Sequence, residues 1–217
     1  MENRRKNVTL VLGGARSGKS LYAQELAAAF ERVTFLATGR AADAEMRKKI
    51  ARHRRERPAS WKTIEAPLKL AEAIRSESQQ ADVVIVDCLT VYAANVMGAA
   101  RNRVKSNLEE CISEVCEAIR DSKARVIAVS NEVGSGVVPP YRSGRIYRDL
   151  LGQMNQRVAQ IADRVVLMIA GVPMTVKESR ISQRSDEAPS AGEAADESSK
   201  SANGGRKRNS RLQETFR

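Results

Sequence analysis

The chain has 217 residues, of which 42% are hydrophobic and only 4% aromatic, and its formal net charge is +11. This length suits one α/β domain with a core of Val, Ile, Leu and Ala. No apolar run is long enough for a membrane span or a signal peptide, and three cysteines without metal-ligand spacing argue against disulfides and zinc, so we expect a cytoplasmic protein.

The positive charge is concentrated in one stretch. Residues 40–62 contain nine Lys or Arg against three Asp or Glu, whereas residues 178–217 contain eight against seven. Nucleic-acid binders usually interleave basic residues with aromatic ones for stacking, and aromatic residues are scarce here. The pattern therefore favours a polyphosphate over a nucleic acid as the anionic partner.

The first expected strand, Val8–Leu12, runs directly into a glycine-rich loop. Residues 13–20 read GGARSGKS, a complete G-x-x-x-x-G-K-[ST] phosphate loop, and a helix is expected over Leu21–Phe30. In such a loop the backbone N–H groups surround a phosphate, the lysine reaches the β- and γ-phosphates, and the final hydroxyl ligates Mg²⁺. The sequence therefore predicts a nucleoside triphosphate site formed by Gly13, Gly14, Ala15, Arg16, Ser17, Gly18, Lys19 and Ser20.

Four further apolar runs are rich in β-branched residues and, like the first, are continuous rather than alternating. They are Val33–Ala37, Val83–Val86, Arg125–Val129 and Val165–Ala170, and helical patterns occur over 104–119 and 146–161. Continuous runs are typical of strands buried on both faces of a parallel sheet. The alternation predicts a doubly wound, mostly parallel α/β sheet, in which ligands bind at the carboxyl ends of the strands, near residues 13, 38, 87 and 130.

Asp87 follows the strand Val83–Val86 directly. In phosphate-loop enzymes a carboxylate at this place holds Mg²⁺ opposite the loop hydroxyl, here Ser20. An Asp that caps the next turn is the plain alternative.

His53 is the only histidine and lies on a helix expected from Asp43 to Glu56, beside several arginines. These cations disfavour the imidazolium form, so they favour a neutral, nucleophilic histidine, and they can also bind a triphosphate. From the residues alone, a solvated polar helix with an incidental histidine remains open.

The composition changes from Glu178 onward, where Ser, Ala, Gly and charged residues dominate. Such a segment buries too little apolar surface to offset the entropy of ordering. We therefore expect a folded catalytic domain over residues 1–177 and a disordered charged tail over residues 178–217.

Several ordered blocks resemble the bifunctional adenosylcobinamide kinase / adenosylcobinamide-phosphate guanylyltransferase family. They are GGARSGKS at 13–20, IARHRRERPASWKTIE at 50–65, VDCLT at 86–90, SNEVGSGVVP at 130–139 and RDLLG at 148–152. The resemblance spans residues 8–177. It implies a RecA-like P-loop fold, usually a homotrimer, with ATP, GTP and Mg²⁺ as ligands and a corrinoid as substrate.

The resemblance also implies two reactions. A nucleotide γ-phosphate passes to the aminopropanol hydroxyl of adenosylcobinamide. A histidine, His53 by position, then attacks the α-phosphate of GTP, releases pyrophosphate and carries GMP to adenosylcobinamide phosphate, giving adenosylcobinamide-GDP. Besides the phosphate loop, the nucleotide contacts carry over to Ala37, Thr38, Gly39, Arg54, Arg55, Glu56, Arg57, Glu65 and Asp87.

Two alternatives stay open at this point. One is a simple phosphate-loop kinase for another small alcohol, in which His53 is idle, and a covalent nucleotide on His53 would exclude it. The other is a nucleotide-dependent nucleic-acid binder, which predicts salt-sensitive DNA or RNA affinity. Arg148 and Asp149 are candidates for a substrate or subunit surface and, as i,i+1 neighbours on a helix, are not expected to form an ion pair.

Overall fold

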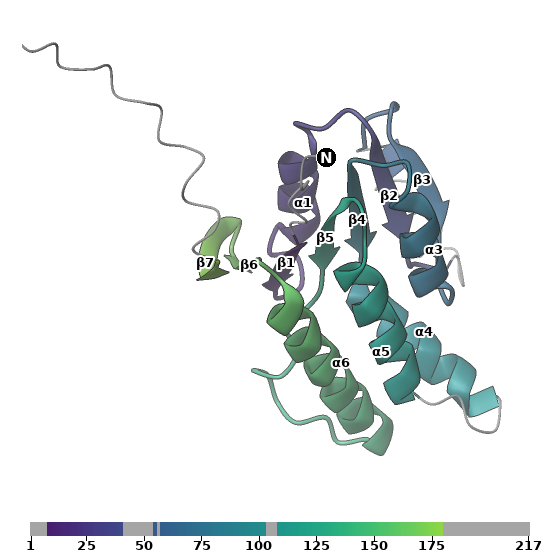
Figure 1. The fold of residues 1–217 in the computed structure, drawn as a ribbon. Helices are drawn as coiled ribbons and strands as arrows, with labels where there is room; N and C mark the ends of the chain where they lie inside the picture. The colour runs from purple at the N-terminus through teal and green to yellow at the C-terminus, as the bar shows by residue number, and fades with distance from the viewer. Residues whose placement is uncertain (1–7, 41–53, 56, 103–107, 180–217) are drawn as a thin grey trace, which may run out of the picture. The chain divides into compact units, whose positions relative to one another are not determined.

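The computed structural model describes residues 8–40, 54–55, 57–102 and 108–179, without the side chains of 100–102. One seven-stranded sheet has the order β3-β2-β4-β5-β1-β6-β7 (Figure 1). The strands are β1 (Val8–Gly13), β2 (Val33–Ala37), β3 (Lys62–Glu65), β4 (Val83–Asp87), β5 (Arg125–Val129), β6 (Arg164–Ile169) and β7 (Val172–Glu178). Only β7 runs antiparallel to its neighbour, so the expected mostly parallel sheet is confirmed.

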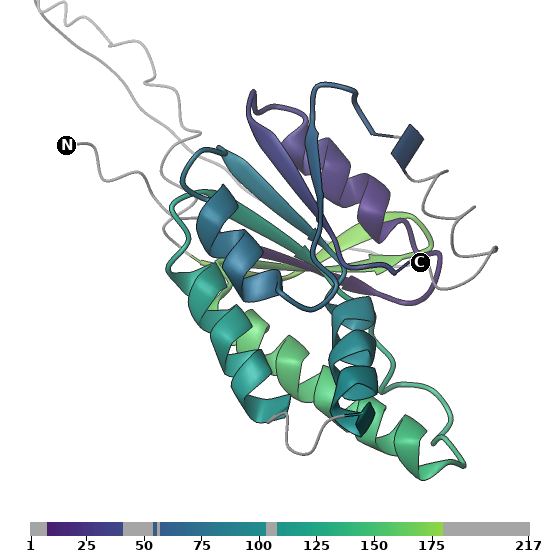
Figure 2. The same ribbon diagram turned by 90° about the vertical axis from the view of Figure 1, so that its right-hand side faces the viewer.

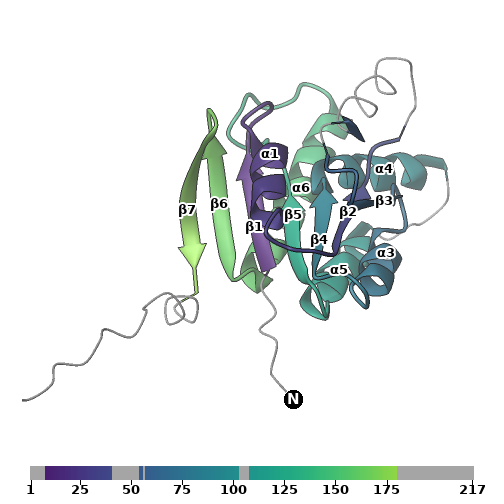
Figure 3. The ribbon, with the colours of Figure 1, turned by 90° about the horizontal axis from the view of Figure 1, so that it is seen from above.

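Helices cover the two faces of the sheet unequally. Within the described residues they are α1 (Lys19–Ala27), α3 (Leu70–Glu77), α4 (Leu89–Asn102), α5 (Leu108–Arg120) and α6 (Arg142–Ile161). Figures 2 and 3 show α1 on one face and the other four helices on the opposite face. A separate apolar cluster fills each side, so the central strands are buried on both faces, as their continuous apolar runs predict.

The two edge strands were not among the predicted ones. Strand β3 reads KTIE, with exposed residues at both ends, and nearly all of β7 is exposed. An edge strand packs against fewer neighbours, so it needs no continuous apolar run.

Two predicted segments, the helix before Arg57 and the C-terminal tail, lie mostly outside the described residues. Of the helix expected over Asp43–Glu56, only Arg54 and Arg55 lie within the described residues, and both are helical and exposed. Of the expected tail, only Glu178, which ends β7, and Ser179 are described. Within the described part of the chain, no helix has the length and apolar character needed to cross a membrane.

The parallel register brings the carboxyl ends of four strands to one edge. Asp87 at the end of β4 pairs with Ala37 of β2 on one side and Val129 of β5 on the other. Strand β5 in turn pairs with β1, which ends at Gly13. The phosphate loop, the residues after β2, Asp87 and the segment after β5 therefore share this edge.

Candidate functional site

The phosphate loop joins β1 to α1 through backbone angles that favour glycine. Gly13 has φ +152°, and a Cβ atom there would lie 2.5 Å from the carbonyl oxygen of Met168. Gly18 has φ +94° and begins α1 without a side-chain cap or an acidic residue in the first turn. The first N–H groups of α1 therefore lack a side-chain cap, and with the helix dipole they favour an anion at this position.

Lys19 lies across this loop. Its side chain is buried, and Nζ donates to the carbonyl oxygen of Gly14 at 2.5 Å and to Ser17 Oγ at 3.3 Å. Burial lowers the pKa of Lys19, and the nearby Cys88 and Asp87 partly oppose that shift. Asp87 at the end of β4 is thus one of the negative groups that favour the charged form of Lys19.

Ser20 and Asp87 supply oxygen atoms of the kind that Mg²⁺ prefers. Ser20 lies in the first turn of α1, half-buried, and Asp87 is half-buried at the end of β4. Across the described ranges, no three His, Cys, Asp or Glu side chains gather as a protein-only metal cluster. A hydroxyl and a carboxylate that complete the shell of a phosphate-bound Mg²⁺ fit this arrangement.

Thr38, directly after β2, connects three elements. Its hydroxyl donates to the carbonyl oxygen of Cys88 and accepts the Cys88 N–H, both at 2.8 Å, and its carbonyl oxygen accepts Asn95 Nδ2 of α4 at 2.8 Å. Thr38 is fully buried, so these bonds are shielded from water. The predicted segment Ala37–Gly39 is thereby fixed next to the end of β4.

The segment after β5 is fixed to the same edge. Glu132 donates its N–H to the carbonyl oxygen of Gly13 at 3.1 Å, and Asn131 donates its N–H to Thr90 Oγ1 at 2.6 Å. Tyr147 of α6 donates its hydroxyl to the carbonyl oxygen of Thr90 at 3.1 Å. These residues received no site role from the sequence, although their place after the strands β4 and β5 is the signal that could have assigned one.

The arginines after His53 differ in their surroundings. Arg54 and Arg55 are exposed, whereas the Arg57 guanidinium lies 3.5 Å from the centroid of the Phe35 ring. Phe35 belongs to the buried cluster under α1, on the face of the sheet that Ala37 also packs against. Arg57 is therefore held on the α1 face of β2, two residues before the end of that strand.

Glu65 ends β3 and pairs in register with Ala37, which places it at the same edge. His53 and Glu56 lie outside the described residues. Arg148 Nε lies 3.5 Å from Asp149 Oδ1, so the expectation that they form no ion pair was wrong. The long guanidinium can bend back along the helix surface to the next side chain.

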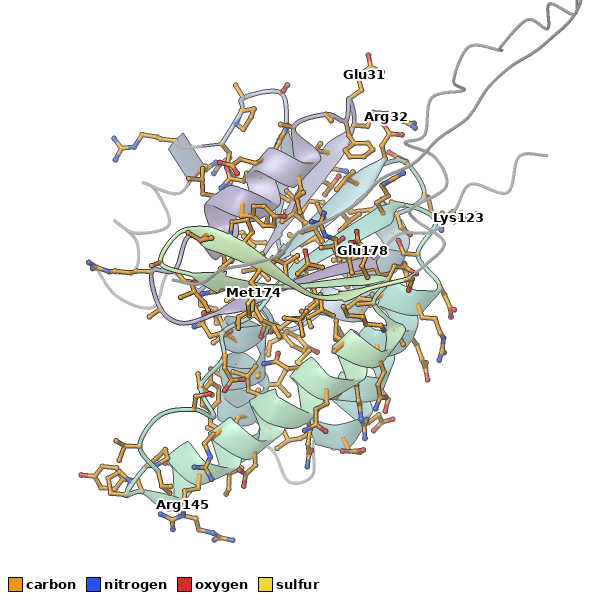
Figure 4. The ribbon with its side chains drawn as sticks, turned by 90° about the vertical axis from the view of Figure 1, so that its left-hand side faces the viewer. Glu31, Arg32, Lys123, Arg145, Met174 and Glu178 are labelled. Carbon is orange, nitrogen blue, oxygen red and sulfur yellow. The ribbon has the colours of Figure 1, made fainter. Side chains whose placement is uncertain are left out.

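Two cavities lie at the opposite, amino-terminal edge of the sheet. One of about 130 Å³ is lined by Thr9, Phe30, Arg125 and Glu178, among others. The second is lined partly by Glu31, Arg32 and Lys123, which Figure 4 shows far from Arg145 at the start of α6. Because the phosphate loop is at the carboxyl edge, neither cavity belongs to the candidate nucleotide site.

Sequence comparisons identify the relatives of this chain. A family model described as cobinamide kinase / cobinamide phosphate guanyltransferase matches residues 9–176. The chain is 42% identical over 173 residues to the bifunctional adenosylcobalamin biosynthesis protein CobP of Pseudomonas aeruginosa, covering 77% of this chain and 96% of that protein. It is 34% identical over 178 residues to the bifunctional adenosylcobalamin biosynthesis protein CobU of Escherichia coli, covering 77% and 98%.

Among solved structures, the fold is similar to a prototypical ATPase from the type III secretion system of pathogenic bacteria. The TM-score is 0.52 at 11% sequence identity, and the match covers 81% of this chain and 58% of that one. This likeness concerns the fold alone, and it agrees with the expected RecA-like arrangement.

Proposed function

Because the chain belongs to the cobinamide kinase / cobinamide phosphate guanyltransferase family, we propose which of its residues perform each of the two reactions. The protein is a bifunctional kinase and guanylyltransferase of adenosylcobalamin biosynthesis. The observation that carries the proposal is the buried Lys19, which lies across the phosphate loop and near Asp87. Both reactions begin with a bound triphosphate, so one nucleotide site serves both.

In the kinase reaction, the corrinoid hydroxyl oxygen forms a bond to the γ-phosphorus of ATP or GTP. The bond from that phosphorus to the β,γ-bridging oxygen breaks, the nucleoside diphosphate leaves, and the hydroxyl proton passes to solvent. Lys19 and the N–H groups of Gly13–Ser20 stabilise the charge on the β- and γ-phosphates. Ser20 and Asp87 would hold Mg²⁺, which neutralises phosphate charge when bound.

In the guanylyl reaction, a ring nitrogen of His53 forms a bond to the α-phosphorus of GTP and pyrophosphate leaves. A phosphate oxygen of adenosylcobinamide phosphate then attacks the same phosphorus, and the P–N bond to His53 breaks. The exposed Arg54 and Arg55, one and two residues after His53, are available for phosphate contacts, and Glu56 follows them in the chain. We assign the sugar and base of GTP to Ala37–Gly39 and Glu65, which are neighbours at one edge of the sheet.

We also propose that copies of the chain self-associate, as the homotrimer implied by the resemblance. The support is the edge strand β7, where Val172, Met174 and Val176 alternate along the strand and are 64%, 49% and 61% exposed. Apolar side chains on an unpaired edge strand favour contact with another chain. Sedimentation of the protein and of a Met174→Lys variant tests this, because a dissociated variant is the expected result.

Intact-protein mass spectrometry after incubation with Mg²⁺ and GTP tests the function. We expect one acid-labile GMP adduct on the protein and none on His53→Ala, which should still fold and bind nucleotide. A folded, GTP-binding protein without the adduct would instead support a simple phosphate-loop kinase in which His53 has no role.

A further inference from the structure

The loop after β5 leads from the nucleotide site to the beginning of α6. At its start, Ser130 donates its N–H to the carbonyl oxygen of Val11 at 2.9 Å, and Glu132 is bonded to Gly13. Figures 1 and 2 show this loop running out to the end of α6 that projects away from the sheet. A molecule bound along the loop therefore has one end beside the phosphate loop.

The far end of the loop is built against α6. Arg145 Nη1 donates to the carbonyl oxygens of Pro139 at 3.1 Å and Pro140 at 2.7 Å. Gly144 packs so closely that a Cβ atom on it would lie 2.7 Å from Pro139 Cβ. Near the start, the Glu132 carboxylate accepts the N–H groups of Gly134 and Ser135. These bonds give the loop a defined shape.

This defined loop presents apolar side chains to solvent. Val137 is 94% exposed, Val138 57% and Tyr141 77%, and Ile146 in the second turn of α6 is 41% exposed. Together they form what we call the loop–helix surface. Exposed apolar side chains that are close in sequence on an ordered segment favour contact with an apolar partner.

The surface also carries positive charge. The first ten residues of α6 contain Arg142, Arg145 and Arg148 against Asp149 alone. Arg145 binds the loop carbonyls and Arg148 lies beside Asp149. Arg142 is exposed and makes no side-chain hydrogen bond or ion pair with the residues that the structure describes, and it lies four residues before Ile146 on the same helix face. A ligand with a broad apolar body and hydrogen-bond acceptors at its edge matches this combination.

We propose that the loop–helix surface binds the corrinoid substrate, with the macrocycle on Val137, Val138 and Tyr141 and its reacting arm directed back along the loop toward the phosphate loop. This assignment rests on the proposed function, which supplies a large macrocycle that carries a hydroxyl in one reaction and a phosphate in the other. The tie between Glu132 and Gly13 then directs the reacting end of the corrinoid toward the bound nucleotide. Tyr147, through its bond to Thr90, fixes α6 relative to the same edge.

The test uses the full chain and two measurements. Equilibrium dialysis with cobinamide, followed by its absorbance, reports corrinoid binding without any nucleotide. The intact mass of the protein after incubation with GTP reports the GMP adduct without any corrinoid. The rate at which the adduct is then lost, measured at several concentrations of adenosylcobinamide phosphate, gives the corrinoid dependence of GMP transfer. The variant is Val137→Ser/Tyr141→Ser. The matched control is Leu68→Ser, an exposed apolar residue in the loop before α3.

We expect the double variant to form the adduct at the normal rate. The corrinoid concentration that gives half-maximal binding or transfer should rise at least about tenfold, which corresponds to a loss of about 1.4 kcal/mol in binding free energy. The control should behave as the wild type does. Unchanged corrinoid binding in the double variant would overturn the proposal, and so would a change in its subunit number by light scattering, which would assign the surface to a second copy of the chain. Wild-type protein that binds cobinamide but forms no GMP adduct would refute the proposed guanylyl reaction. Even then, weaker cobinamide binding by the double variant would support the assignment of the corrinoid site to the loop–helix surface.

Discussion

Thr38 and Cys88 are joined by two hydrogen bonds through a single hydroxyl group. Thr38 Oγ1 donates to the carbonyl oxygen of Cys88 and accepts its N–H, each at 2.8 Å. The N–H of Thr38 in turn donates to the carbonyl oxygen of Asp87 at 3.1 Å. One buried side chain thus sets the position of the residue after Asp87 relative to the end of β2.

Thr38→Val should lower both stability and activity. The change keeps the shape of the side chain but leaves the backbone groups of Cys88 without their partner, so we expect the free energy of unfolding to fall by about 1–3 kcal/mol. Kinase turnover should fall as well, because Asp87 would no longer be held in place. Urea unfolding and a kinase assay measure the two effects.

The matched control is Thr34→Val on β2, the strand that Thr38 directly follows. The Thr34 hydroxyl makes one longer contact, 3.4 Å to Glu77 Oε2, near the other end of the strand. It should cost less stability and leave turnover unchanged. Equal losses in the two variants would contradict a special role for the bonds between Thr38 and Cys88.

Lys19→Met should separate activity from stability. Burial lowers the pKa of Lys19, which means that the folded protein holds the charged form at a cost. Removing that charge while keeping the apolar stem should leave the melting temperature unchanged or higher. Both reactions should slow by roughly 10²–10³-fold, the range for losing one donor that stabilises developing charge.

The control for Lys19 is Lys69→Met, an exposed lysine that pairs with Glu72 three residues later. Kinase and adduct-formation rates, with thermal melts, should show no loss of activity there. Normal rates in Lys19→Met would remove this lysine from the mechanism.

The sequence predicted the centre of the sheet better than its edges. Strands buried on both faces carry continuous β-branched runs, and Val33–Ala37 and Arg125–Val129 agree with the structure to the residue. Strands β3 and β7 lack such runs because they lie at the edges. The helix α3 has only eight residues and was not predicted from the sequence.

The site divides in the same way. The phosphate loop and Asp87 are local motifs, readable because each follows an apolar strand. The bonds from Thr38 to Cys88 and from Asn131 to Thr90 join residues 50 and 41 positions apart, so no local spacing signals them. The place of Arg57 over Phe35 likewise depends on how the chain packs after residue 40.

Phe35→Leu should weaken guanylylation more than phosphorylation. The change keeps an apolar side chain in the core but removes the ring on which Arg57 lies, an interaction worth about 1–2 kcal/mol when shielded from water. If Arg57 contacts GTP from this position, adduct formation should slow about five- to thirtyfold, and the KM for GTP in that step should rise.

The matched control is Phe30→Leu, because Arg125 lies 5.1 Å from the Phe30 centroid in a similar pairing at the amino-terminal edge. Because Phe30 is only partly buried, this change should destabilise the protein less than Phe35→Leu does, and it should not slow adduct formation. If the two variants slow adduct formation equally, the loss of core packing explains both, and Arg57 has no role that depends on Phe35.

The Cys88 thiol links stability to alkaline pH. Burial, with a smaller effect of the Asp87 carboxylate, raises the pKa of Cys88 from 9.0 to about 11. Between these two values the unfolded chain gives up a proton that the folded chain keeps, so stability falls as the pH rises through this window and is unaffected by this group below it. At pH 10.5 the loss amounts to about 2 kcal/mol, at about 1.4 kcal/mol for each tenfold change.

Cys88→Ala should therefore lose about 2 kcal/mol less stability than the wild type between pH 8 and pH 10.5, measured by urea unfolding at both values. Groups that titrate in this range and do not interact with Cys88 are present in both proteins and cancel in the comparison. Cys111→Ala is the control, because burial also raises the pKa of that thiol on α5 but the thiol is less buried than Cys88, so its effect should be smaller. If the wild type and Cys88→Ala lose stability in parallel, the Cys88 thiol ionises in the folded protein as readily as in the unfolded chain, and the tight packing of β4 against Thr38 does not exclude water from it.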